Sequence, residues 1–102
     1  MNETASGSAR REDLRATIAQ ARTEALSFRD SIKDARTRDA LALPIITRLG
    51  DVERMYLSDD SEHAPWWFDW AEYETQAAKA ALRAAKKIVD QYGGPDNVRT
   101  VG

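Results

Sequence analysis

The spacing of apolar residues in the first third of the chain constrains the fold more than any other feature of the sequence. A seven-residue apolar repeat forms one stripe along an α-helix, whereas a strand would alternate apolar and polar residues, a pattern that appears nowhere in this chain. The repeat predicts a helix over residues 9–38, with Ser8 as a candidate N-cap. Its apolar positions, at intervals of four and three, are Leu14, Ile18, Ala21, Ala25, Phe28, Ile32 and Ala35.

The same intervals continue into a second, shorter segment. Proline is tolerated in a first helical turn, so Pro44 favours a helix that begins between residues 39 and 44 and ends near Leu57. The apolar positions of this segment are Leu41, Ile45, Leu49, Val52 and Tyr56.

A third helix is predicted from Pro65 to Tyr92, because the alanine-rich stretch that follows Pro65 runs without a helix breaker. The sequence Gly-Gly-Pro at residues 93–95 predicts its end, since glycine adopts the left-handed conformation of a C-cap and proline does not continue a helix.

These elements predict one all-α domain, an up-down-up three-helix bundle over residues 9–92, with a flexible N-terminus (1–8), a flexible C-terminal tail (93–102) and hence disordered termini. A chain of 102 residues suits a single domain. Because the middle helix is predicted to be shorter than the other two, parts of their apolar faces would stay uncovered and would call for a partner or a second copy.

Composition excludes several classes of function. The chain has no cysteine, which excludes disulfides, thiolate zinc sites and thiol nucleophiles. No apolar run approaches the roughly 18 residues of a membrane span, and the N-terminus lacks the apolar stretch of a secretory signal. We therefore expect a cytoplasmic protein that does not enter the membrane.

Catalytic signatures are missing as well. His63 is the only histidine, and the loop around it lacks the ligand spacing of a zinc or calcium site. There is no glutamate and histidine three residues apart, no glycine-rich loop before a helix, and no serine with a recognisable base. We expect no enzymatic activity, no cofactor and no metal, with His63 exposed in a loop.

Residues 51–74 combine negative charge with aromatic side chains. This segment carries eight acidic residues and one basic residue, and five of the eight aromatic residues of the chain lie between residues 66 and 73. The flanking segments are mildly basic. Charge is therefore segregated along the sequence, with an acidic, aromatic segment between two mildly basic ones.

Angular positions on the third helix divide these aromatic residues. At about 100° per residue, Trp66, Trp70 and Tyr73 share a face with later alanines, and we expect them to fill the core. Phe68 falls among polar residues, so we expect it to be exposed, either covering the chain termini or serving as an anchor for another protein. Glu74 falls inside the apolar arc and is expected to pair with a cation.

Two sets of residues are therefore candidate sites. The first is a partner-binding surface that comprises Tyr56, Asp59, Asp60, Trp67, Phe68, Asp69 and Glu72. The second is a charge ladder of arginines seven residues apart along one edge of the apolar stripe, which comprises Arg15, Arg22, Arg29 and Arg36. The ladder is expected to pair with Glu53, Glu72 or Glu74, and pairing with a partner's acidic helix or with phosphate stays open.

The leading hypothesis is a non-enzymatic adaptor or regulatory protein that binds another protein, with homo-oligomers through the heptad face of residues 9–38 left open. The alternative is an inhibitor that presents residues 51–74 to a basic site on an enzyme or a nucleic-acid-binding protein. A bundle that binds nucleic acid through the arginine ladder is the third hypothesis, which the acidic start of the third helix disfavours.

Overall fold

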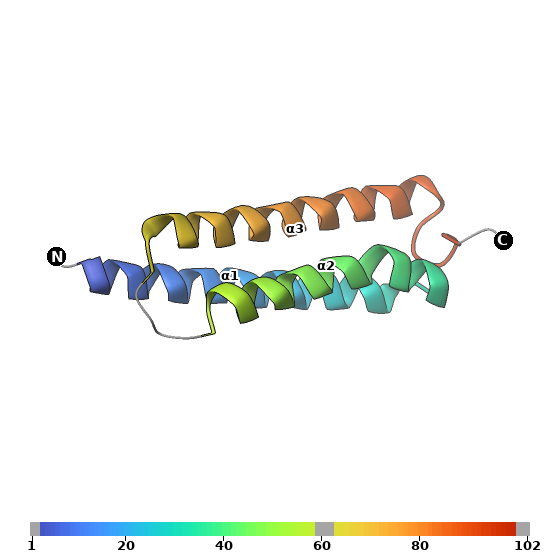
Figure 1. The fold of residues 1–102 in the computed structure, drawn as a ribbon. Coiled ribbons are helices and arrows are strands. Elements are labelled where there is room, and N and C mark those ends of the chain that lie inside the picture. Colours follow the sequence, from blue (N-terminus) through green and yellow to red (C-terminus); the bar gives the residue numbers. More distant parts are fainter. Residues whose placement is uncertain (1–2, 59–62, 100–102) are drawn as a thin grey trace.

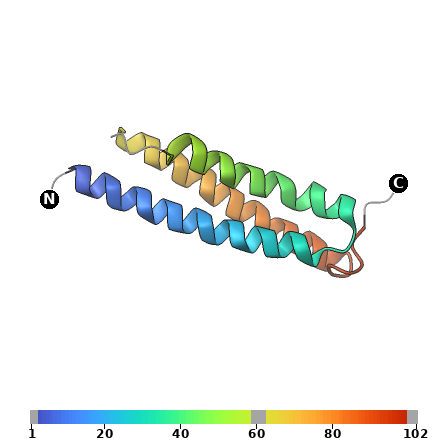
Figure 2. The ribbon, with the colours of Figure 1, turned by 90° about the horizontal axis from the view of Figure 1, so that it is seen from below.

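The computed structural model describes residues 3–58 and 63–99, with side chains from Ala9 onward. It contains three helices, α1 (Glu3–Ser31), α2 (Ala35–Tyr56) and α3 (Pro65–Gln91). They run up, down and up along an elongated bundle of 54 × 18 × 18 Å, with every pair of helices in contact (Figures 1 and 2). The all-α three-helix fold predicted from the sequence is confirmed. In the described part of the chain, no helix combines the length and apolar character that crossing a membrane requires.

Each helix contributes one apolar stripe to a common core. Six of the seven predicted heptad positions are buried, five of them in α1 from Leu14 to Phe28 and the sixth, Ile32, directly after it, whereas Ala35 is exposed at the start of α2. The stripe of α1 is thus buried in the core of the single chain, and self-association through it stays a prediction. The other buried positions of the helices are Thr37, Ala42, Ile45, Leu49 and Val52 in α2, and Phe68, Ala71, Thr75, Ala78, Leu82, Ala85 and Val89 in α3.

The first two helices meet at a different place from the one predicted. The chain turns after Ser31, and Asp34 caps α2 by accepting bonds from the backbone N–H of Thr37 at 3.0 Å and from its hydroxyl at 2.7 Å. Pro44 consequently lies inside α2, on an exposed position, and does not mark the start of the helix. The cap and the buried register of α2 outweigh the preference of proline for a first turn.

Two consequences follow for helix length. α2 has 22 residues against 29 in α1 and 27 in α3, so the middle helix covers more of its neighbours than the sequence predicted. At its other end α1 begins at Glu3, so Ser8 is not its N-cap. The difference in length is therefore too small to carry the argument for a partner.

The end of α3 follows the predicted mechanism. Gly93 and Gly94 have φ angles of 98° and 90°, and the Gly94 N–H donates to the carbonyl of Val89 at 2.9 Å. The chain then folds back, because the Pro95 carbonyl accepts from the Lys33 N–H at 3.1 Å and Val98 is buried. Part of the segment that the sequence assigned to a flexible tail thus closes this end of the bundle.

Replacing Asp34 by alanine tests this assignment of the α1–α2 boundary. The substitution removes the acceptor of both Thr37 bonds, so we expect a loss of about 1 kcal/mol in the free energy of unfolding, measured by urea denaturation. Asp34→Asn, which keeps an acceptor oxygen, is the control and should cost only a fraction of this. Equal losses in both variants would contradict the capping role.

Candidate protein-interaction surface

α3 carries two apolar seams with the same heptad spacing. The core seam is the buried set from Phe68 to Val89 described above. At about 100° per residue the second seam is centred about 120° away from the first, on the side of α3 that faces solvent. We call it the outer seam, and it comprises Trp66, Trp70, Tyr73, Ala77, Ala81, Ala84 and Ile88.

The aromatic residues of both seams lie on the opposite side of α3 from the one predicted. Trp66, Trp70 and Tyr73 were expected in the core, yet their exposed fractions are 63%, 49% and 62%. Phe68 was expected to be exposed, yet it is 4% exposed. The core seam has large apolar side chains in both halves of the helix, at Phe68, Leu82 and Val89, whereas the outer seam has only alanines between Tyr73 and Ile88.

Phe68 is held beneath the first turns of α1. The guanidinium carbons of Arg10 and Arg11 lie 5.9 and 5.6 Å from the centre of its ring, within the range of cation–π contacts. A ring that is covered by its own chain is not available to a partner. The prediction that Phe68 is an exposed anchor is wrong, because α1 extends far enough to cover it.

Tyr56 and Trp67 join the end of α2 to the start of α3. The Trp67 indole N–H donates to the Tyr56 carbonyl at 3.1 Å, and the two rings meet edge to face with centroids 4.9 Å apart. His63 stacks on Trp67 with centroids 4.6 Å apart and is half-buried, contrary to the exposed position expected for it. These aromatic contacts hold the end of α2 against the start of α3. Asp59 and Asp60, which were predicted to bind a partner, lie outside the described residues.

The acidic residues Asp69 and Glu72 are shared with α1. Arg10 Nη2 lies 2.5 Å from Asp69 Oδ1 and 3.2 Å from Glu72 Oε2. The hydrogen bond to Asp69 is the main cause that raises the pKa of Arg10 above its ordinary value, followed by the opposing effect of burial and by the bond to Glu72. Both carboxylates stay more than half exposed. Their charge is therefore offset in part and remains accessible from solvent.

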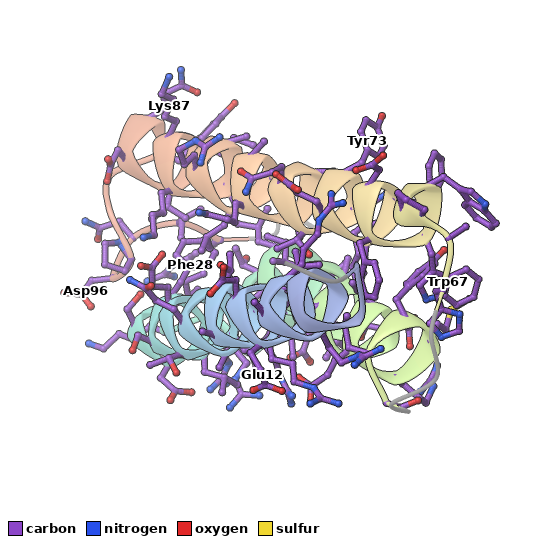
Figure 3. All side chains as sticks on the ribbon, turned by 90° about the vertical axis from the view of Figure 1, so that its left-hand side faces the viewer. Glu12, Phe28, Trp67, Tyr73, Lys87 and Asp96 are labelled. Atoms are coloured by element: carbon purple, nitrogen blue, oxygen red, sulfur yellow. The ribbon has the colours of Figure 1, made fainter. Side chains whose placement is uncertain are left out.

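The outer seam borders a groove between α2 and α3. Leu43 and Met55 of α2 are 48% and 60% exposed. Tyr73 points outward from α3, whereas Trp67 lies on the side of α3 toward α2 (Figure 3). Two adjoining hollows share the side chains of Met55, Tyr56 and Trp70. The first is lined mainly by Leu43, Pro44, Thr47, Asp51 and Trp70, and the second by Met55, Trp66, Trp67, Trp70 and Tyr73.

An ion pair spans the groove. Arg48 Nε of α2 lies 3.0 Å from Glu74 Oε2 of α3, and the Glu74 side chain is only 20% exposed. The sequence predicted a cation for Glu74, and the structure supplies one from α2 and not from α1. The groove therefore combines apolar and aromatic side chains with a paired charge that links α2 to α3.

The arginine ladder is divided between two helices. Arg15 pairs with Glu12 at 2.8 Å and also donates to the Leu57 carbonyl, while Arg22 lies 3.7 Å from Glu53, one of the partners predicted for the ladder. Arg29 lies 3.3 Å from Asp30. Arg36 is exposed in the first turn of α2, so the turn at residues 32–34 separates it from the other three.

Comparison with known proteins adds no constraint on function. No protein-family model matches this sequence, and no curated protein or solved structure is significantly similar to it. Among residues 3–58 and 63–99, no group of three or more histidine, cysteine or acidic side chains could hold a metal ion. The candidate site is therefore the groove between α2 and α3, where large apolar side chains are exposed to solvent.

Alanine substitutions at Phe68 and Trp66 distinguish the two seams. Phe68→Ala leaves a cavity in the core and should lower the free energy of unfolding by about 3–5 kcal/mol. Trp66→Ala, which removes a larger but mostly exposed ring, should cost less than about 1 kcal/mol. Thermal and urea unfolding followed by circular dichroism measure both. A larger loss for Trp66→Ala than for Phe68→Ala would show that the outer seam, and not the core seam, is the buried one.

Proposed function

We propose that this protein is a non-enzymatic protein-interaction module that docks a partner helix on the groove between α2 and α3. The observation that carries the proposal is the exposure of Trp66, Trp70 and Tyr73 beside Leu43 and Met55. Contiguous apolar side chains of this size are costly to leave in water, and aromatic residues ringed by polar groups are typical centres of protein interfaces.

A helix is the element that fits this surface best. Two adjacent helices form a long shallow depression, and the apolar residues on the α3 side recur at intervals of four and three, which a partner helix would match. A helix in this position would add a fourth member to the bundle, with apolar contacts to Trp66, Trp70 and Tyr73 and polar contacts to the Arg48–Glu74 pair.

The other hypotheses from the sequence receive less support. The inhibitor hypothesis relied on Phe68 and on free carboxylates, but Phe68 is buried and Asp69 and Glu72 contact Arg10. The nucleic-acid hypothesis relied on a continuous arginine ladder, of which Arg15, Arg22 and Arg29 take part in ion pairs within the chain. The cytoplasmic location and the adaptor or regulatory role stay predictions.

A comparison of three baits tests the proposal. Wild type, Trp70→Glu and Ala19→Glu are immobilised and exposed to a lysate of the cells that make the protein, and bound proteins are quantified by mass spectrometry. Trp70→Glu puts a charge on the groove and should reduce the bound partner, a second copy of this chain included, by at least about 30-fold, the effect of losing an interface hot spot.

Ala19→Glu is the matched control, because Ala19 is exposed on α1 away from the groove. It should bind as wild type does, and circular dichroism should show the same helix content in all three proteins. Unchanged binding to Trp70→Glu would contradict the proposal.

A further inference from the structure

We propose that the occupant of this surface is a second copy of the same chain, with α3 of one copy crossing α3 of the other in antiparallel orientation. This inference rests on the proposed function, since it names the partner of the same surface. It is drawn from the symmetry of the outer seam, the charge distribution along α3 and the exposed area.

The outer seam is symmetric about Ala77. Trp66 and Ile88 lie eleven residues on either side of Ala77, Trp70 and Ala84 lie seven residues away, and Tyr73 and Ala81 lie four residues away. Offsets of four, seven and eleven residues return to the same face of a helix. An antiparallel pair that is centred on Ala77 therefore keeps both outer seams in contact along their full length.

The same symmetry places a large side chain opposite an alanine in two of the three outer pairs. Trp70 meets the partner's Ala84, Tyr73 meets the partner's Ala81, and Trp66 meets the partner's Ile88. Close packing between helices requires this alternation of large and small residues across facing positions. In a parallel pair, each tryptophan would face the same tryptophan and the alanines would face one another across a gap.

Charge along α3 favours the same orientation. The half from Pro65 to Ala77 carries the carboxylates Asp69, Glu72 and Glu74 and no basic residue, whereas residues 78–91 carry four basic residues and one carboxylate. An antiparallel pair brings the acidic half of each helix to the basic half of the other, and a parallel pair brings like charges together.

One flank of the seam illustrates this complementarity. Asp69 and Lys87 lie at about the same angle around α3, beside the outer seam. Tyr73 and Lys87 both point away from α1 and α2 (Figure 3). In a two-fold symmetric pair, the flank of one α3 faces the same flank of the other α3. Asp69 then lies opposite position 85 of the second copy, two residues from the partner's Lys87.

The exposed aromatic rings supply a large part of the area that a dimer interface needs. At about 200 Å² for each buried aromatic side chain, the exposed parts of Trp66, Trp70 and Tyr73 supply roughly 350 Å² per copy. A standard interface takes about 800 Å² from each partner, and Leu43, Met55 and the rest of the outer seam add to the rings. The contact from Trp66 to Ile88 would run roughly 33 Å along the helix.

Single cysteines test the orientation directly, because the chain has none of its own. Ala77→Cys lies on the proposed two-fold axis and should form a disulfide-linked dimer under mild oxidation. Ala84→Cys should form little, since its two copies would lie roughly 21 Å apart, beyond the reach of a disulfide. Linkage at both positions would indicate a parallel pair and would overturn the proposal.

A large-to-small exchange tests the register. Trp70→Ala removes a ring from the interface and Ala84→Trp places two rings opposite each other, so each should raise the dimer dissociation constant by at least about 30-fold, measured by sedimentation equilibrium. The double variant Trp70→Ala/Ala84→Trp restores one ring opposite one alanine and should return the constant to within about 10-fold of wild type. Absence of rescue would overturn the register.

The two proposals fail in different ways. A wild-type chain that remains monomeric at millimolar concentration and forms no disulfide through Ala77→Cys overturns the self-association alone. The proposed function still stands in that case if a different protein binds wild type and is lost with Trp70→Glu. If Trp70→Glu weakens neither the binding of a second copy nor the binding of any other protein, both proposals fail.

Discussion

The structure depends on the burial of one heptad stripe from each of three helices in a single narrow core. Side chains such as Ile18, Leu49 and Leu82 meet at the centre of the bundle, and apolar burial of this kind is the dominant favourable term in folding. The bundle is only 18 Å across, and each helix is covered by the other two on one side alone. This arrangement buries the apolar side chains of a helix that has one stripe. A helix with two stripes keeps the second one exposed to solvent.

α3 is the helix with two stripes, and this accounts for the properties of the surface. α1 covers Phe68 through Arg10 and Arg11, while α2 holds the start of α3 through the bond between Trp67 and the Tyr56 carbonyl. These contacts fix the rotation of α3 about its axis and direct the outer seam toward solvent. Trp66 and Trp70 are therefore exposed because the contacts of the core turn their side of α3 toward solvent.

Charged side chains around the bundle act mainly as a frame for this arrangement. Arg10 joins α1 to Asp69 and Glu72 of α3, Arg22 joins α1 to Glu53 of α2, and Arg48 joins α2 to Glu74. Partly exposed ion pairs contribute little energy individually. Their value is positional, because each of them links two helices at the border of an apolar surface and helps to specify which faces meet.

The sequence by itself determined the fold class, the heptad stripe of α1 and the end of α3. Each of these follows from local spacing or from glycine backbone conformation, as with Gly93 and Gly94. It did not determine the start of α2, where Asp34 prevailed over Pro44, or which seam of α3 is buried. Both seams have the same periodicity, so only the packing of α1 and α2 against α3 decided that Phe68 lies inside and Trp70 outside.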